Sequence, residues 1–281
     1  MSGKLYVVGT PIGNLGDISK RAVETLQKAD FIAAEDTRVT IKLLNHFDIK
    51  KELLSYYEHN KNTKGNLILE RILKGESCAL VSDAGMPAIS DPGEELVRKA
   101  RDMGIEIEAV PGPCALVTAL AVSGMPGGRF CFEGFLSVNK ASRRRHLAEI
   151  ANEKRTMIFY EAPHKLLNTL KDMLECFGDR EIAIARELTK IHETVLRTTL
   201  SRAVEYYTEN PPKGEFVLIV SGAAENKVEY TMQDAVKIAT KLLNENHSTS
   251  AAAAAAAKIT GLKKGEIYKQ ILRWYNNESN L

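Results

Sequence analysis

The sequence predicts an α/β fold made of two domains, followed by a small helical segment. Three observations indicate this class. The length of 281 residues suits about two domains. Apolar runs, turn-rich loops and amphipathic helical patterns alternate along most of the chain, which is typical of a parallel sheet covered by helices. No strand pattern follows residue 222, so we expect domains at residues 1–115, 116–224 and 225–281.

Composition excludes several classes of protein. Hydrophobic residues make up 44% and charged residues 26% of the chain, which is ordinary for a globular protein. The net charge of +2 speaks against a protein that is basic throughout. No apolar run approaches the ~20 residues that span a bilayer, and the N-terminus lacks a signal peptide, so we expect a cytoplasmic protein. The four cysteines are widely spaced, which predicts reduced thiols and no metal site.

In the first half, four apolar runs predict strands, and each ends at a loop of turn-forming or charged residues. A helix is expected after the first strand, with Ala22 and Leu26 on its apolar face. Asp91 is expected to cap a second helix, with Pro92 in its first turn and Glu94 completing a capping box. The predicted strands are Leu5–Val8, Phe31–Ala34, Ser77–Val81 and Ile105–Val110, and the loops after them are Gly9–Asn14, Glu35–Arg38, Ser82–Gly93 and Pro111–Pro113.

The second half repeats this pattern more loosely. Its helix signal is clearest around Leu166 and Leu170 and ends at Gly178. After residue 222 the pattern is helix, turn, helix, and the turn at residues 261–265 is typical of a helix-turn-helix connection. The strands predicted in this half are Phe130–Leu136, Thr156–Tyr160, Ile182–Ala185 and Phe216–Val220.

Ligands of parallel sheets bind beyond the carboxyl ends of the strands, where these loops lie. Asp83 follows the third strand without an evident local role; it either accepts hydrogen bonds from a ribose or amino group, or shapes an Asx-turn. The Glu35–Arg38 loop and the stretch around His59 fit a binding site and a solvated turn equally well. Neither a Rossmann fingerprint nor a Walker loop is present.

Basic residues cluster in two places. Arg143, Arg144 and Arg145 follow Lys140 closely, and such a cluster either pairs with phosphates or forms a solvated helix face. Five basic residues against one acid lie between residues 258 and 273, which is compatible with RNA contact or with packing onto the main body. Lys263 and Lys264 belong to this second cluster.

Eight motifs occur in the order typical of one family. The motifs are Gly9–Leu15, Glu35–Arg38, Ser82–Gly93, Val110–Ala115, Phe132–Leu136, Tyr160–His164, Arg186–Glu193 and Lys213–Glu215. With these motifs the chain resembles the small-subunit ribosomal RNA methyltransferases of the tetrapyrrole methylase superfamily, from about residue 4 to residue 222, and its last helices resemble their C-terminal domain.

This resemblance implies two α/β domains with S-adenosylmethionine in the cleft between them, usually in a homodimer. It also implies 2′-O-methylation of a cytidine in the decoding region of 16S rRNA, in the small ribosomal subunit. Where many relatives carry Ser, this chain has Cys114, whose thiol is the poorer hydrogen-bonding group. By position, the implied cofactor contacts are Pro11, Asp83, Ala84, Met86, Cys114, Ala115, Tyr160 and Glu215.

The implied reaction is attack of a ribose hydroxyl on a sulfonium methyl group, which depends mainly on in-line positioning and needs a base for the proton. The candidate bases are Glu35, Asp36 and His59, and we favour the Glu35–Arg38 loop because it lies at a strand end. Arg38 and Lys190 are candidates for holding a phosphate or stabilising negative charge on oxygen.

Two alternatives stay open. One is a methyltransferase of the same superfamily that acts on a corrin precursor or another tetrapyrrole, against which the basic clusters argue. The other is a non-catalytic RNA-binding factor of ribosome assembly, against which the intact motifs at Asp83, Pro111–Pro113 and Lys213–Glu215 argue.

Overall fold

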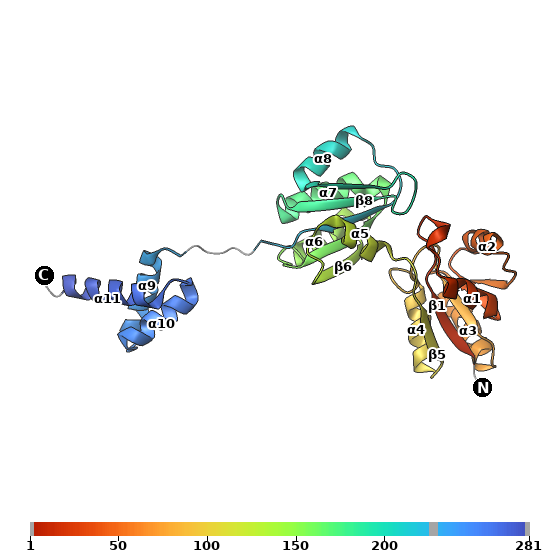
Figure 1. Cartoon of the computed structure of the whole chain (residues 1–281), viewed down its shortest axis with the longest axis horizontal. Coiled ribbons are helices and arrows are strands. Elements are labelled where there is room, and N and C mark those ends of the chain that lie inside the picture. Colours follow the sequence, from red (N-terminus) through yellow and green to blue (C-terminus); the bar gives the residue numbers. More distant parts are fainter. Residues whose placement is uncertain (1–2, 225–229, 279–281) are drawn as a thin grey trace. The chain divides into compact units, whose positions relative to one another are not determined.

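The first half of the chain forms a wholly parallel five-stranded sheet, as the alternating pattern predicts. The computed structural model describes residues 3–224 and 230–278 (Figure 1). The strand order is β3-β2-β4-β1-β5, so the carboxyl ends of all five strands lie at one edge. The strands are β1 (Lys4–Val8), β2 (Phe31–Ala34), β3 (Glu52–Ser55), β4 (Cys78–Val81) and β5 (Glu106–Val110).

Helices cover both faces of this sheet. Side chains alternate between the two faces along each strand and so belong to two separate hydrophobic cores. Leu5 and Leu80 pack with α3 and α4 on one face, whereas Val8 and Val81 pack with α1 and α2 on the other. The α/β fold class is thereby confirmed. The helices are α1 (Lys20–Lys28), α2 (Thr37–His46), α3 (Lys61–Leu73) and α4 (Gly93–Asp102), with a 3₁₀ turn η1 (Leu15–Asp17) before α1.

Two local predictions need correction. The Glu35–Arg38 segment is not a free loop, because Asp36 caps α2 and its Oδ1 accepts the N–H of Arg38 at 2.8 Å. At the start of α4, Pro92 takes the N-cap position and the expected capping box does not form. Instead Asp91 Oδ1 accepts the N–H groups of Ala88 and Gly93, both at 2.8 Å, and so fixes the loop to the helix start.

The second half forms a mixed sheet rather than a parallel one. Its strand order is β6-β7-β10-β8-β9, in which β6 and β7 are parallel and every other pair is antiparallel. The central strand β10 carries five consecutive buried residues, as expected for a strand covered on both faces. The strands are β6 (Phe130–Phe135), β7 (Thr156–Glu161), β8 (Glu181–Arg186), β9 (Thr194–Thr199) and β10 (Phe216–Val220).

Helix α5 packs on one face of this sheet, and α6, α7 and α8 pack on the other face, so the sheet lies between two hydrophobic cores. The core beneath α5 also takes in Ile12, from the loop after β1, so the two halves share apolar contacts. The helices are α5 (Ala115–Ser123), α6 (Lys140–Glu149), α7 (Pro163–Phe177) and α8 (Leu200–Glu209).

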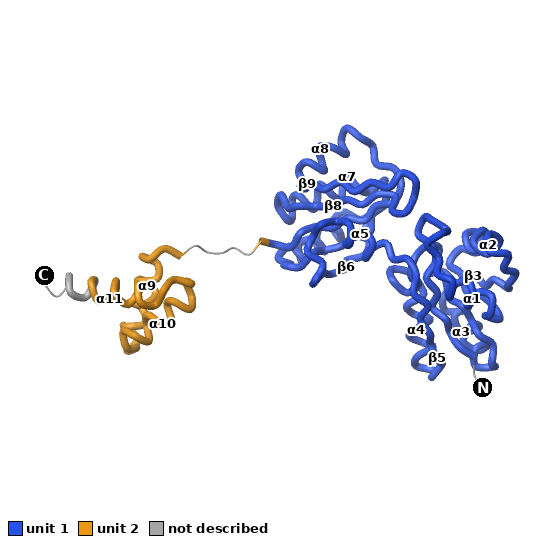
Figure 2. Tube along the Cα trace, in the orientation of Figure 1, with its two compact units in different colours: residues 1–223 blue, residues 224–281 orange. Residues whose placement is uncertain are grey.

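The chain divides into two compact units, residues 1–223 and 224–281, and both sheets belong to the first (Figure 2). The second unit contains α9 (Met232–Asn244), α10 (Thr249–Thr260) and α11 (Lys264–Glu278). Alanines of α9 and α10 fill its core together with Ile267 and Ile271, and their small side chains allow close packing of the helices. Within residues 3–224 and 230–278, no helix has the length and hydropathy to span a membrane.

The loops after β1 and β5 touch through their backbones. A Cβ added to Gly9 would lie 2.7 Å from both Cα and N of Gly112, and 2.7 Å from Met86 Sδ. The loop after β4 joins them, because Thr10 and Gly85 exchange two backbone hydrogen bonds of 2.9 and 3.1 Å. Three strand-end loops therefore form one layer at the carboxyl edge of the sheet.

We expect Gly9→Ala to destabilise the first unit by about 1–3 kcal/mol, because the new methyl group meets backbone atoms that cannot rotate away. Urea denaturation followed by circular dichroism measures this change. Gly128→Ala is the matched control, since a Cβ there meets nothing within 4 Å. Equal stability of the two variants would contradict the close contact.

Candidate functional site

A cavity of about 430 Å³ lies at the carboxyl edge of the first sheet and is lined by residues from both sheets. The first half contributes residues from the loops after β1, β2 and β4, among them Ile12, Glu35 and Asp83. The second half contributes residues near the ends of β6, β7 and β8 and around the start of β10, among them Tyr160 and Leu188. The volume is within the range of small-molecule sites, so the cavity is the natural place for a cofactor.

The carboxylates of Asp83 and Glu35 connect the loops after β2 and β4 by hydrogen bonds to backbone N–H groups. Asp83 Oδ1 accepts the backbone N–H of Asp36 at 2.9 Å, and Glu35 Oε2 accepts the backbone N–H of Asp83 at 3.4 Å. Burial raises the pKa of Glu35 above its ordinary value despite that hydrogen bond, and the nearby Asp83 carboxylate adds to the shift. Burial likewise raises the pKa of Asp83. The adjacent strands β2 and β4 thus bring two desolvated acids to one wall.

Asp36 and Arg38 lie beside this wall but do not line the cavity. The Asp36 carboxylate accepts three side-chain hydrogen bonds from Arg38: Nη2 donates to Oδ2 at 2.6 Å, and Nε donates to Oδ1 at 3.0 Å and to Oδ2 at 3.2 Å. These bonds lower the pKa of Asp36 to about 2. The Arg38 side chain is 87% exposed. His59 is exposed, away from the cavity lining, and its ring contacts Tyr57.

Lys190 pairs with two acids in the second half of the first unit. Its Nζ lies 3.0 Å from Glu187 Oε1 and 2.9 Å from Glu215 Oε2, and Glu215 lines the cavity. Burial alone lowers the pKa of Lys190, but the two carboxylates outweigh it and raise the pKa. A Cβ on Gly13 would lie 2.6 Å from Lys190 Cγ, so the loop after β1 packs directly on this cluster.

The predicted cofactor residues gather around the cavity. All of them line it except Pro11, whose neighbour Ile12 does so instead. Tyr160 Oη accepts the N–H of Leu116 at 3.2 Å, and burial raises its pKa to about 12, so the phenol keeps its proton. The cavity is also lined by Glu161, Ser90, Phe135 and Phe216, which were not among the predicted site residues.

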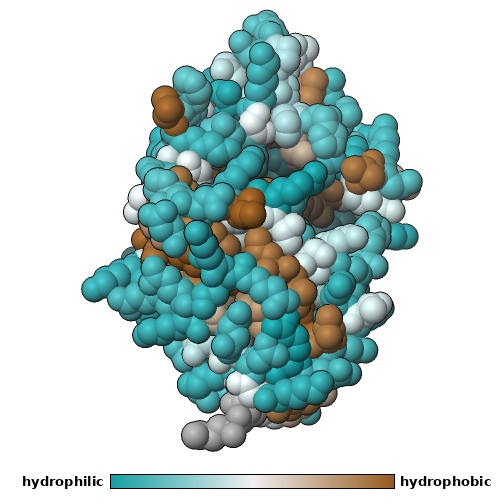
Figure 3. All heavy atoms as spheres, turned by 90° about the vertical axis from the view of Figure 1, so that its right-hand side faces the viewer, coloured by the Kyte–Doolittle hydropathy of each residue, from teal (hydrophilic) through white to brown (hydrophobic). Residues whose placement is uncertain are grey.

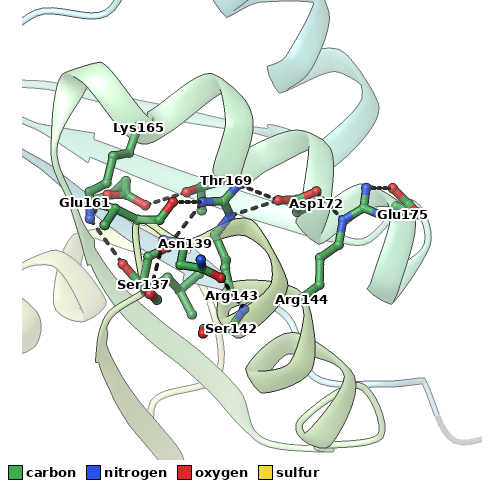
Figure 4. Close-up of polar contacts among 12 residues, drawn as sticks. Ser137, Asn139, Ser142, Arg143, Arg144, Glu161, Lys165, Thr169, Asp172 and Glu175 are labelled. Carbon is green, nitrogen blue, oxygen red and sulfur yellow. Dashed lines mark hydrogen bonds and ion pairs between the residues drawn. The ribbon is translucent and has the colours of Figure 1, made fainter.

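Glu161 follows Tyr160 and is held by donors on all sides (Figure 4). Its carboxylate lies 2.9 Å from Lys165 Nζ, accepts the Thr169 hydroxyl at 2.5 Å and accepts the backbone N–H of Ala162 at 2.8 Å. Only 3% of Glu161 is exposed. These contacts fix the start of α7 against the cavity wall. The motif spanning residues 160–164 was the signal in the sequence for this residue.

Arg143 is a structural residue, contrary to the prediction that it binds RNA. It is buried, with Nη2 2.6 Å from Asp172 Oδ2 and Nη1 donating to Ser137 O at 3.2 Å (Figure 4). Arg144 shares Asp172 and also pairs with Glu175. Although burial opposes it, the two guanidinium groups lower the pKa of Asp172. The Arg143 guanidinium is therefore buried and paired inside the first unit, whereas Arg144 is partly exposed.

The other predicted RNA-binding residues lie at the surface. Arg145, on the outer side of α6, is exposed. Lys263 and Lys264 are exposed in the second unit, at the turn before α11. In the part of the chain that the structure describes, no three His, Cys, Asp or Glu side chains are grouped to hold a metal ion.

Two family profiles match the chain. One is described as "Tetrapyrrole (Corrin/Porphyrin) Methylases" and matches residues 4–204. The other is described as "RsmI C-terminal HTH domain" and matches residues 232–274.

Curated relatives match nearly the whole chain. One from Xylella fastidiosa, named Ribosomal RNA small subunit methyltransferase I, is 50% identical over 95% of this chain and 98% of its own length. One of the same name from Synechocystis is 46% identical over 95% of this chain and 96% of its own.

Solved structures share the fold of the first unit. The methyltransferase CobJ superposes with a TM-score of 0.59 at 22% identity, over 79% of this chain and 95% of its own. Uroporphyrin-III C-methyltransferase from Thermus thermophilus, complexed with S-adenyl homocysteine, gives a TM-score of 0.56 at 18% identity, over 78% of this chain and 97% of its own. At these identities the likeness concerns the fold alone.

We expect Arg143→Met to destabilise the first unit by about 3 kcal/mol, because it leaves a buried carboxylate with one partner fewer. Thermal unfolding measures the loss. Arg145→Met is the matched control on the same helix, with an expected change within about 0.5 kcal/mol since the side chain is exposed. A stable Arg143→Met protein with impaired RNA binding would restore the original interpretation of this residue.

Proposed function

Because this chain belongs to the tetrapyrrole methylase family, and within it to the group named Ribosomal RNA small subunit methyltransferase I, we propose that it transfers a methyl group from S-adenosylmethionine to the 2′-hydroxyl of a cytidine in 16S rRNA. The observation that carries the proposal is the cavity between strand ends of both sheets, with its pair of desolvated acids. Relatives that cover nearly the whole chain supply the substrate class.

The cavity suits the proposed cofactor. Ile12, Leu188 and Val217 offer apolar walls for an adenine ring. Asp83 offers carboxylate oxygens for ribose hydroxyls or the ammonium group of the cofactor. When bound, S-adenosylmethionine supplies an electrophilic methyl group on a positively charged sulfur.

Glu35 is the base in this proposal. With the cofactor bound, its methyl group would pass from the sulfur to the 2′-oxygen, and Glu35 would take the hydroxyl proton as the new carbon–oxygen bond forms. Asp36 is a poorer base, because its low pKa and its bonds to Arg38 hold it as an ion pair. His59 lies away from the cavity lining. Arg38, which is exposed beside the site, is placed to hold a phosphate of the RNA.

RNA contact extends to the second unit in this proposal. Lys263 and Lys264 present exposed ammonium groups at a helix-turn-helix connection, and Arg145 adds a third cation on the first unit. We also propose that the protein acts in the cytoplasm as a homodimer, as the family resemblance implies. Sedimentation of the purified protein tests the dimer, because a monomer at micromolar concentration would contradict it.

Small ribosomal subunits from cells that lack the protein provide the direct test. With labelled S-adenosylmethionine, we expect label in 16S rRNA as 2′-O-methylcytidine, identified by nucleoside mass spectrometry. A porphyrinoid substrate is the comparison. Label in the porphyrinoid alone would favour a tetrapyrrole methyltransferase, and failure to bind S-adenosylhomocysteine in calorimetry would favour a non-catalytic assembly factor.

We expect Glu35→Gln to lower kcat by about 10²–10⁴-fold while binding S-adenosylhomocysteine as tightly as the wild type. The amide keeps an oxygen for the Asp83 N–H but cannot take a proton. Because burial raises the pKa of Glu35, the acid limb of the wild-type rate profile should lie above the ordinary glutamate pKa. Asp17→Asn, at an exposed acid of η1, is the control. Undiminished turnover by Glu35→Gln would remove Glu35 as the base.

A further inference from the structure

Two exposed apolar side chains border the cavity. Hydrophobic residues reach the surface at several places, and on the face in Figure 3 they lie in separate patches among hydrophilic ones. Among the described residues with large exposed apolar side chains, Ile89 and Phe135 are the ones that also line the cavity. Phe135 is 55% exposed and Ile89 is 44% exposed. One comes from each half of the first unit.

A bulge in the edge strand β6 aims Phe135 at the cavity. In a regular strand, Phe132 and Phe135 would point to opposite faces of the sheet. The pairing with β7 shifts register between Phe132 and Gly134, whose φ of +66° is in the left-handed region. Both rings therefore contact Tyr160, with centroids 4.9 Å away for Phe132 and 5.4 Å for Phe135.

The neighbours of Phe135 hold its ring at the mouth of the cavity. Lys165 Nζ lies 5.5 Å from the ring centroid. The next residue, Leu136, is buried and anchors the chain after the strand. A Cβ on Gly134 would lie 3.4 Å from Ser90 Oγ, so the loop that carries Ile89 meets the end of β6. An aromatic ring is thus fixed in place while more than half of the residue stays open to solvent.

We propose that the base of the acceptor nucleotide leaves the RNA stack and packs against Phe135, with Ile89 on its other side. This inference rests on the proposed function. The reacting 2′-oxygen is bonded to the carbon next to the one that carries the base, so a ribose at the cavity must bring its base to the same mouth. Unpaired bases in RNA commonly stack on aromatic side chains, and enzymes that modify nucleotides extrude them.

The acceptor base fits this ring better than the cofactor does. Of the aromatic residues in the described cavity lining, Phe216 is 3% exposed and Tyr160 is partly buried, so these belong to the enclosed part where a cofactor is covered. Phe135 lines the same cavity but is 55% exposed. A ring in that position adds little to an enclosed cofactor but is open to a ligand that arrives from solvent.

The test compares Phe135→Ala, Phe135→Leu and Phe135→Trp in the full-length protein, with small ribosomal subunits lacking the modification as substrate. Loss of stacking should lower kcat/KM for the subunits by about 5- to 150-fold in the Ala and Leu variants. Trp should keep activity near the wild type, because it restores a stacking surface. Phe130→Ala, at the exposed start of the same strand, should leave kcat/KM unchanged.

The affinity for S-adenosylhomocysteine, measured by calorimetry, separates the outcomes. It should be unchanged in all variants; weaker binding in Phe135→Ala would mean that the ring covers the cofactor and would overturn the proposal. Equal kcat/KM for Phe135→Leu and Phe135→Trp would also overturn it, since apolar bulk rather than stacking would then matter. If the wild type itself fails to methylate the subunits, the proposed function fails instead.

Discussion

The contact between Gly9 and Gly112 is the constraint on which the site depends. Two backbones approach so closely that a side chain on either would strike main-chain atoms. The bridge between Thr10 and Gly85 extends this layer to the loop after β4. Gly13 then carries the first loop onto the Lys190 cluster of the second half. These short glycine contacts therefore position the loops after β1, β4 and β5 beside the cavity.

Much of the first sheet could be predicted from the sequence, because its strands are short apolar runs that end in turn residues. Some of the elements that escaped prediction lack such contrast. Helix α5 is apolar on nearly all sides and shows no helical period, because exposed apolar residues such as Val117 and Val122 lie opposite its buried face. Helix α6 has the opposite composition, with only Arg143 and Leu147 buried. Edge strands β3 and β9 alternate too weakly to stand out.

The position of the cavity was predicted better than the partners of the charged residues around it. Strand ends of a parallel sheet converge by topology, so residues such as Asp83 and Glu35 could be expected to meet before any contact was known. Nothing comparable locates the partner of a buried cation. Asp172 lies 29 residues from Arg143 along the chain, on a helix whose pattern marks Asp172 only as polar. Residues of the same type, adjacent in sequence, therefore separate into a buried ion pair at Arg143 and an exposed cation at Arg145.

Loop rigidity matters for the proposed reaction because a carboxylate is a weak base for a ribose hydroxyl, so most of the acceleration would come from alignment. Four non-glycine residues in the loops around the cavity have a positive φ. Ala88 and Ser90 have φ of +66° and +63°, and Glu187 and Thr189 have +52° and +65°. Such conformations cost about 1–3 kcal/mol each unless neighbours stabilise them. Asp91 accepts the N–H of Ala88 at 2.8 Å, and the Glu193 carboxylate accepts the N–H of Thr189 at 2.6 Å. The acids of these loops thus serve alignment as well as charge, which explains why so many carboxylates surround a site whose substrate is an anion.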